Sequence, residues 1–334
     1  MTGVLLIQLG TPDSPSVSDV RKYLSEFLND SRVIDIPYLL RKILVNLIIV
    51  PFRAPKSAKL YKLLWTDKGS SLLFYSVSLK EKLQSALGNK FEVELAMRYQ
   101  NPSMESVLER MKKKVYDKII ILPLFPHYAS ASTGSAINKA LDIIRKWWVI
   151  PELKIISQFY DNEEYINSVA ARGKQFDLSG YDQILFSFHG LPVRQVDKVY
   201  NDGIPCNDHK CDSEINDSNR FCYKAACYAT ARLLAQKLNI PKEKYTVCFQ
   251  SRLDKKWLEP FSDKVIAELG QKGVKKLLVF SPAFVADCLE TTVEIGHDYL
   301  QIFKNNGGES LQLVESLNDS PLWVEAVKNM VLSQ

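Results

Sequence analysis

The chain has 334 residues, of which 46% are hydrophobic and 24% are charged, and its net charge is +5. This length and composition allow a large buried core spread over two domains, and they exclude collagen-like and low-complexity chains. The longest basic run, the three lysines at 112–114, fits the solvated face of a helix rather than a nucleic-acid-binding arm. We therefore expect a globular protein that binds no nucleic acid.

The amino-terminal stretch MTGVLLIQLG has no basic leader, and its apolar run is too short for a secretory signal. The chain also lacks any uncharged apolar stretch of about 18 residues, the length that a membrane-spanning helix needs. We therefore expect a cytoplasmic protein. Because disulfides are rare in that compartment, clustered cysteines indicate metal ligands first.

Short apolar runs alternate with segments of helical period, which predicts parallel strands joined by helices. The predicted strands cover residues 4–10, 91–99, 118–126 and 153–159, and then 183–190, 245–251, 275–284 and 311–315. This pattern predicts an α/β protein with two Rossmann-like lobes, each built on a parallel four-stranded sheet. We expect the lobes to cover 1–150 and 151–319, with a carboxyl-terminal helix at 320–334 joining the first lobe.

The two halves resemble each other at the ends of their strands. LLIQLGTP is similar to ILFSFHGLP, and KIIILPLFP is similar to KKLLVFSPAF. Because ligands of open α/β sheets bind beyond the carboxyl ends of the strands, we expect His127, His189 and the segment after Phe284 at a functional site. The chain has neither a GxGxxG motif nor a Walker A motif, so a nucleotide is not indicated.

A long apolar stripe follows a predicted helix at 36–50. The stripe consists of Ile36, Leu39, Leu40, Ile43, Leu44, Leu47 and Ile48. Arg41 and Lys42 lie off the stripe, and the basic residues Arg53, Lys56 and Lys59 follow it. This pattern fits either a helix that packs on the core or an interfacial helix that contacts a membrane or a hydrophobic ligand.

His189, in the motif SFHGLP, is the only histidine that directly ends a predicted core strand. Such a histidine is either a hydrogen-bonded structural residue or a general base at a functional site. Gly190 beside it allows close approach of the neighbouring backbone. His189 is therefore a catalytic candidate.

The segment DCLETTVEIGHD carries four acids, Asp287, Glu290, Glu294 and Asp298, at steps of three, four and four. This spacing predicts one acidic face of a helix. Like charges at such spacings destabilise a helix, and no lysine or arginine is interleaved to neutralise them. The face is either solvated surface or, because it follows a core strand, a path for cations or protons.

Four of the six cysteines, Cys206, Cys211, Cys222 and Cys227, lie in one polar segment. Cys222 and Cys227 are five positions apart, so an uninterrupted α-helix would not point both at one ion, and we expect Cys222 to precede a helix. Four thiolates suit tetrahedral zinc or an iron–sulfur cluster, and the spacing does not choose between them. His209 is an alternative ligand.

Together these segments resemble ferrochelatase, the terminal enzyme of haem synthesis, over essentially the whole chain. The similar segments are LLIQLGTPDSP, AMRYQNPS, LPLFPHYASASTGSA, ILFSFHGLP, FQSRLDKKWLEPFSD and SPAFVADCLETTVEI. The resemblance implies two Rossmann-like lobes with a porphyrin cleft between them. It also implies the insertion of Fe²⁺ into protoporphyrin IX or coproporphyrin III, which forms haem.

The resemblance further implies roles for individual residues. His189 and Glu290 match positions that handle the metal and the protons at the porphyrin centre, and Asp287 and Glu294 would continue an acidic path. Residues that match the porphyrin pocket are Arg98, Tyr99, His127, Tyr128 and Trp257. The segment 36–53 matches the family's hydrophobic lip, which is associated with membrane contact and substrate entry.

The cysteine segment looks like the internal cluster of some bacterial ferrochelatases, which holds [2Fe–2S]. The resemblance therefore implies this cluster on Cys206, Cys211, Cys222 and Cys227, with zinc as the alternative occupant. One departure is Cys288, which stands where many relatives have a histidine.

Two rival functions stay open on the sequence alone. One is a related cobalt or sirohydrochlorin chelatase, which the long hydrophobic lip disfavours. The other is a non-catalytic haem- or iron-sensing module whose cluster is the functional part. With the ferrochelatase interpretation we expect porphyrin and ferrous iron as substrates and a peripheral contact with the inner membrane.

Overall fold

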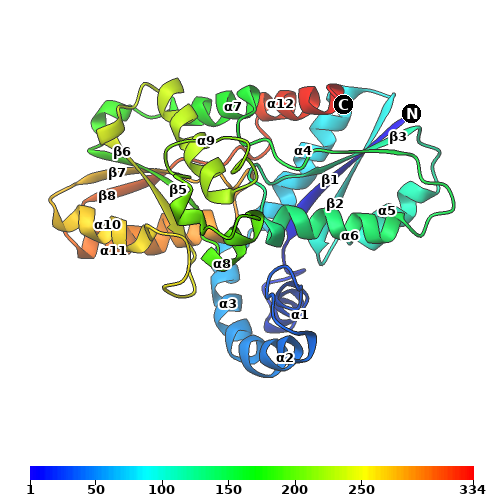
Figure 1. The fold of residues 1–334 in the computed structure, drawn as a ribbon, viewed down its shortest axis with the longest axis horizontal. Helices are drawn as coiled ribbons and strands as arrows, with labels where there is room; N and C mark the ends of the chain where they lie inside the picture. Colours follow the sequence, from blue (N-terminus) through cyan, green and yellow to red (C-terminus); the bar gives the residue numbers. More distant parts are fainter. The chain divides into compact units, whose positions relative to one another are not determined.

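The computed structural model describes all residues, Met1–Gln334, and the chain divides into two compact units. The first unit comprises Met1–Phe125, Ala129–Gln158 and Asn318–Gln334, and the second comprises Pro126–Tyr128 and Phe159–Leu317. Each unit contains its own four-stranded sheet (Figure 1). No helix in the chain combines the length and the apolar character that crossing a bilayer requires.

The first sheet has the strand order β2-β1-β3-β4, and all neighbouring strands are parallel. Its strands are β1 (Thr2–Gly10), β2 (Phe91–Tyr99), β3 (Lys118–Pro123) and β4 (Glu152–Ile155). The four strands predicted from the apolar runs are confirmed, although β3 and β4 end earlier than predicted. The apolar runs mark the buried residues, and hydrogen-bonded pairing between the strands ends before those runs do.

Helices cover both faces of the first sheet (Figure 1). The helical elements of this unit are α1 (Val17–Leu28), α2 (Tyr38–Ile43), η1 (Leu44–Ile49), α3 (Val50–Leu64), α4 (Ser71–Leu87), α5 (Met104–Lys112), η2 (Ser130–Gly134), α6 (Ser135–Ile144) and α12 (Pro321–Leu332). Alternate strand residues such as Leu5 and Ile7 pack with Val107 of α5 and Ala140 of α6. On the other face lie α4 and α12. Burial of this apolar surface stabilises the unit.

The second sheet has the order β6-β5-β7-β8, again with all neighbours parallel. Its strands are β5 (Gln183–His189), β6 (Tyr245–Gln250), β7 (Lys276–Phe280) and β8 (Ser310–Leu313), so all four predicted strands of this half are confirmed. In the parallel register His189 pairs with Gln250. The carboxyl ends of β5 and β6 therefore lie side by side.

The helical elements of the second unit are α7 (Glu163–Gly173), η3 (Leu178–Gly180), α8 (Val193–Val196), η4 (Asp197–Val199), η5 (Cys206–Asp208), α9 (Tyr223–Lys237), η6 (Lys242–Lys244), α10 (Ser262–Gln271), η7 (Glu290–Tyr299) and α11 (Leu300–Asn305). One buried cluster joins Leu185 and Val279 of the sheet to Ile266 of α10, Ile295 of η7 and Phe303 of α11. This packing fixes η7 against the sheet that carries His189.

Candidate active site

His189 is the last residue of β5, where the sequence predicts it. Its ring nitrogen Nδ1 lies 2.6 Å from the carbonyl oxygen of Gly190. Because a carbonyl only accepts hydrogen bonds, Nδ1 is the donor, and in the neutral ring Nε2 carries the lone pair. The hydroxyl of Tyr223 donates to the backbone carbonyl of His189 at 2.8 Å. The imidazole is thus held by its backbone and by Nδ1, with Nε2 as a basic nitrogen.

Gly190 allows a close approach of three elements beside His189. A side chain at this position would meet the carbonyl oxygen of Gln250 at 2.8 Å and the ring of Trp257 at 3.3 Å. The N–H of Gly190 instead donates to that Gln250 carbonyl at 2.7 Å. The Trp257 ring centroid lies 6.4 Å from that of His189. The prediction that Gly190 permits close backbone contact is confirmed.

The acidic segment forms a π-helix, η7, and not the α-helix that its spacing predicted. π-helical segments are frequent at functional sites. Asp287 lies before η7, and its carboxylate accepts from the hydroxyl of Thr291 and from the N–H of Ser316, both at 3.3 Å. The prediction of four acids on one helical face is therefore wrong for Asp287, because the helical segment begins after it. Glu290 and Glu294 do share η7.

The two glutamates of η7 have different surroundings. Burial raises the pKa of the Cys288 thiol, and the charge of Glu290 raises it further, so Cys288 is a neutral thiol near Glu290. Glu294 instead accepts a hydrogen bond from the hydroxyl of Tyr299 at 2.8 Å. Burial, followed by the charge of Glu294, raises the pKa of Tyr299, so this hydroxyl stays a donor.

Arg98 and Tyr99 lie at the end of β2 in the first unit, in a network around Asp30. The guanidinium of Arg98 and the hydroxyl of Tyr99 donate to Asp30 at 2.5 and 2.9 Å. Burial alone would raise the pKa of Asp30, but hydrogen bonds from Ser135 and the Arg32 backbone, together with the Arg98 charge, lower it overall. Tyr99 is fully buried, whereas Arg98 keeps some exposed surface. Arg98 and Tyr99 are therefore both held by the carboxylate of Asp30.

His127 and Tyr128 belong to the second unit, and they differ in burial. The hydroxyl of Thr230 donates to the Tyr160 carbonyl, so it accepts from Nε2 of His127 at 2.9 Å. Nδ1 of His127 has no hydrogen-bond partner, and burial lowers the pKa of His127 to about 3. This histidine is therefore neutral and deeply buried. Tyr128 is partly exposed and contacts the ring of Phe221, with centroids 6.3 Å apart.

Comparison with known proteins identifies the family. The ferrochelatase family's sequence model matches residues 1–334. The chain is 45% identical over 333 residues to the ferrochelatase of Legionella pneumophila (strain Lens), covering 99% of both chains. It is also 45% identical over 331 residues to that of Coxiella burnetii (strain Dugway 5J108-111), covering 98% of this chain and 92% of the relative. The chain belongs to the ferrochelatase family.

The activity is therefore the insertion of Fe²⁺ into a porphyrin, a lyase reaction of haem biosynthesis. Among solved structures, SirB from Bacillus subtilis with Fe³⁺ matches with a TM-score of 0.57 at 12% identity, covering 99% of this chain and 94% of SirB. At that identity the likeness shows the fold alone. It confirms the predicted chelatase-like α/β architecture. The high sequence identity over the whole chain is to ferrochelatases.

The segment 36–53 that matches the lip forms α2, η1 and the first turn of α3 in the first unit. Seven of its apolar side chains are between 45% and 73% exposed: Tyr38, Leu39, Leu40, Ile43, Leu47, Ile48 and Phe52. Arg41, predicted to lie on the polar side, is buried and donates to the carbonyls of Ile34 and Ile36 at 3.3 and 2.8 Å. Val45 is buried as well. The core-packing alternative is therefore wrong for five of the seven stripe residues, which face solvent, whereas Ile36 and Leu44 are half-buried.

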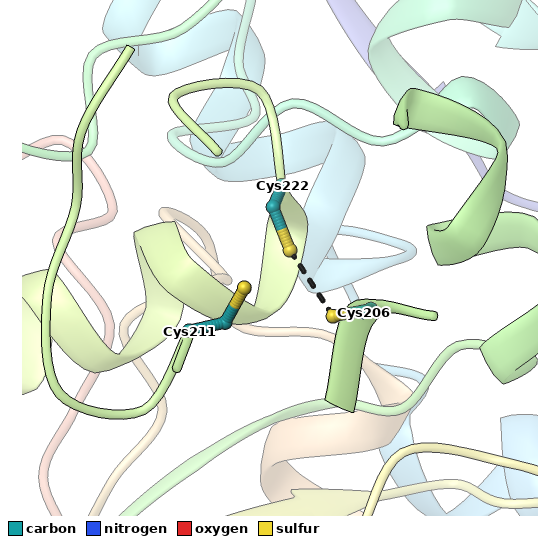
Figure 2. Close-up of side chains that lie close together, drawn as sticks. All are labelled: Cys206, Cys211 and Cys222. Atoms are coloured by element: carbon teal, nitrogen blue, oxygen red, sulfur yellow. Dashed lines mark hydrogen bonds between the residues drawn. The ribbon is translucent and has the colours of Figure 1, made fainter. Parts of the chain in front are cut away.

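The cysteine segment of this ferrochelatase gathers three of its four thiols. The sulfur atoms of Cys206, Cys211 and Cys222 lie within 4.8 Å of one another, and all three residues are buried (Figure 2). The sulfur atoms of Cys206 and Cys222 lie 3.4 Å apart. Cys222 is the N-cap of α9, as predicted. Cys227 is buried within α9, where burial raises the pKa of its thiol, and it does not lie within the group of three.

The surroundings of the three sulfurs suit metal-bound thiolates. The hydroxyl of Tyr200 lies 2.9 Å from the Cys211 sulfur, and Nδ2 of Asn219 lies 3.8 Å from it. Donors of this kind stabilise sulfur that carries negative charge. The ring of Tyr200 stacks on His209 with centroids 3.9 Å apart, and Nε2 of His209 lies 3.3 Å from an Asp202 oxygen. His209 is therefore turned to Asp202 and Tyr200, and the residues present fit a thiolate-bound metal centre.

Several residues that hold the site were not singled out from the sequence. Tyr223 donates to the backbone carbonyl of His189, and Asp30 forms an ion pair with Arg98. Gln250, at the end of β6, hydrogen-bonds to both β5 and η7. Gln250 could have been found, because FQSR follows a predicted strand just as SFHG does. Asp30 and Tyr223 lie in helical or loop segments without any such pattern, and only the fold brings them to the strand ends.

Proposed function

We propose that in iron insertion His189 takes a pyrrole proton as general base, while Glu290 acts beside it as metal ligand or proton carrier. The hydrogen bond from Nδ1 of His189 to the Gly190 carbonyl supports this proposal. It leaves the lone pair of Nε2 to accept a proton when the ring is neutral. The nitrogens of a planar porphyrin point into the ring plane, so the ring has to bend before they converge on iron. Binding energy along the macrocycle can supply that distortion.

The remaining site residues divide by burial. Asp287 and Glu294 flank Glu290, and the family resemblance assigns both to an acidic path; we keep Asp287 on that path, whereas the hydrogen bonds of Glu294 favour the role argued in the next subsection. Arg98, Tyr128 and Trp257 keep exposed surface and are proposed to contact the porphyrin. Tyr99 and His127, which also match positions of the family's porphyrin pocket, are buried. We propose that they hold the contacting residues in place.

A metal-insertion assay tests the function directly. The purified protein is given Fe²⁺ under anaerobic conditions with protoporphyrin IX in one series and coproporphyrin III in the other. We expect metalloporphyrin from at least one of the two, and the ratio of their kcat/KM values identifies the physiological substrate. Absence of product from both porphyrins in folded protein would contradict the proposal.

We also propose that the cysteine segment holds a [2Fe–2S] cluster, with Cys206, Cys211, Cys222 and Cys227 as ligands. The proposal is supported by the three buried sulfurs and by the hydroxyl of Tyr200 beside them. A cluster of this kind accepts and returns one electron. Two of its four thiolates bind each iron, so the fourth sulfur need not converge on the same point as the other three. Zinc is the alternative occupant.

We further propose that the exposed lip binds a membrane surface, so that the protein acts in the cytoplasm in peripheral contact with the inner membrane. Apolar side chains on one side of the helix would enter the interfacial region, and the neighbouring basic residues would meet anionic headgroups. Those basic residues are Lys42, Arg53, Lys56 and Lys59. A lip that meets the bilayer would also receive an apolar porphyrin from it.

The double variant Leu47→Asp, Ile48→Asp should weaken liposome association by at least about tenfold, because burying each of these side chains contributes about 1.5–3 kcal/mol. It should also raise KM for porphyrin, with little change for iron. Co-sedimentation with anionic liposomes and steady-state kinetics measure the two effects. Val115→Asp is the matched control, because Val115 is 88% exposed and lies outside the lip. Unchanged sedimentation and KM in the double variant would contradict the membrane proposal.

A further inference from the structure

The dipeptide Gln250–Ser251 connects the strand of His189 to the helix of Glu290. Gln250 pairs with His189 in the parallel ladder, and its carbonyl accepts from Gly190. Its side-chain amide donates to the backbone carbonyl of Glu290 at 2.9 Å, and its amide oxygen accepts from the Ser187 hydroxyl at 2.8 Å. Gln250 is only 1% exposed. A buried amide whose two ends are both bonded thus joins β5, β6 and η7.

Ser251 makes two hydrogen bonds to one carboxylate. Its N–H donates to Oε1 of Glu294 at 2.8 Å, and its hydroxyl donates to Oε2 at 2.5 Å. Ser251 has a φ of 61°, in the left-handed region that residues other than glycine rarely adopt. Such a conformation persists only where the surroundings determine it, and here the two bonds to Glu294 do so.

The carboxylate of Glu294 is saturated with donors. Oε1 also accepts from Tyr299, and Oε2 also accepts from the amide of Gln250 at 3.3 Å. A carboxylate offers about four acceptor positions, and all of them are used here. Iron or a proton could bind Glu294 only if one of these hydrogen bonds were broken.

We propose that Glu294 is a positioning residue which, through Ser251 and Gln250, fixes η7 and hence Glu290 relative to His189. This inference rests on the roles proposed above for His189 and Glu290. Misplacement of a reacting group by about 1 Å can lower a rate by up to about a hundredfold. The anchor therefore supports turnover without touching the porphyrin or the iron.

The competing role for Glu294 is that of a proton or cation relay. Glu294 lines a pocket together with Arg252, Asp263 and Tyr299, so an ionic path from solvent is a fair rival. The two roles predict opposite effects when Ser251 loses its hydroxyl. A relay carboxylate would be freer and would work at least as well, whereas an anchor would be weakened.

The test compares Ser251→Ala, Ser251→Gly and the control Ser168→Ala. Ser168 is a buried serine of α7 whose hydroxyl donates to the Glu164 carbonyl, so its variant also loses a hydrogen-bonded hydroxyl, but away from η7. We expect kcat to fall at least about tenfold in both Ser251 variants, with KM for porphyrin within about twofold of wild type. The glycine variant relieves the left-handed strain, so an equal fall in both variants assigns the effect to the lost hydrogen bond.

Glu294→Gln, alone and combined with Ser251→Ala, completes the test. Because both changes break one anchor, the double variant should lose no more activity than the worse single variant. Amide hydrogen exchange should rise in residues 290–299 of the Ser251 variants and stay unchanged in Ser168→Ala. Wild-type kcat in Ser251→Ala, or additive losses, would overturn the anchor. An active His189→Ala variant would overturn His189 as the proposed base. The hydrogen-exchange measurement on the Ser251 variants would still test whether Glu294 anchors η7.

Discussion

His189→Ala should bind porphyrin normally and form almost no metalloporphyrin. The porphyrin is expected to be held by apolar contacts along its faces and edge, to which one imidazole adds little. Loss of the proton acceptor, in contrast, acts on the step in which the pyrrole nitrogens lose their hydrogens. Because a positioned general base contributes about 10²–10⁴-fold to a rate, kcat should fall by at least a hundredfold.

Porphyrin fluorescence titration and thermal unfolding are the controls for this variant, since they separate loss of chemistry from loss of folding. Glu290→Gln is the companion variant, because it keeps the size of the side chain and removes its charge. It should also lower kcat strongly, whether the carboxylate binds iron or carries a proton. If folded His189→Ala keeps near-normal kcat, the base is another group, and the acids of the path would have to take both protons.

The strands were predictable because each is a buried run of apolar residues that a parallel sheet covers on both faces. The run in β2 matched residue for residue, whereas β3 and β4 end sooner than their apolar runs. Helix type was less predictable. The spacing of Glu290 and Glu294 fits an α-helix, whereas η7 is π-helical and packs Ile295 and Tyr299 against the second sheet. Local spacing carries no information on that packing.

The same limit applies to the individual site residues. His189 could be found because it ends a strand, but the tautomer that makes Nε2 basic follows from the nearby Gly190 carbonyl. His127 also follows a predicted strand, yet it is buried and neutral. Arg41 lies off the predicted apolar stripe, yet it is buried, and its Nη1 donates to the carbonyls of Ile34 and Ile36 before α2. In each case the deciding partner lies on a different segment or in the backbone.

Cys→Ser at any of the four proposed ligands should remove the colour of the protein. Anaerobically purified wild type should be coloured and contain two irons and two acid-labile sulfides per chain, the composition of a [2Fe–2S] cluster. Soft thiolates select iron–sulfur clusters, and a serine hydroxyl replaces them poorly. Iron and sulfide analysis with the visible spectrum measures the loss. Cys248→Ser is the matched control, because Cys248 is a buried cysteine of β6 outside the cysteine segment.

Cys227 is the decisive position in that series. Its sulfur is not part of the group formed by Cys206, Cys211 and Cys222, and it lies in α9 beside Tyr223. Cys222 caps the same helix, so both cysteines would hold the cluster only if the start of α9 presents Cys227 together with the capping thiolate. Bleaching of Cys227→Ser, with Cys248→Ser still coloured, would support the four-cysteine cluster. If Cys227→Ser keeps its colour, only three cysteines are ligands. If the wild type is colourless and contains zinc, the site holds a single zinc ion instead of the cluster. That result would leave the proposed iron insertion at His189 unchanged.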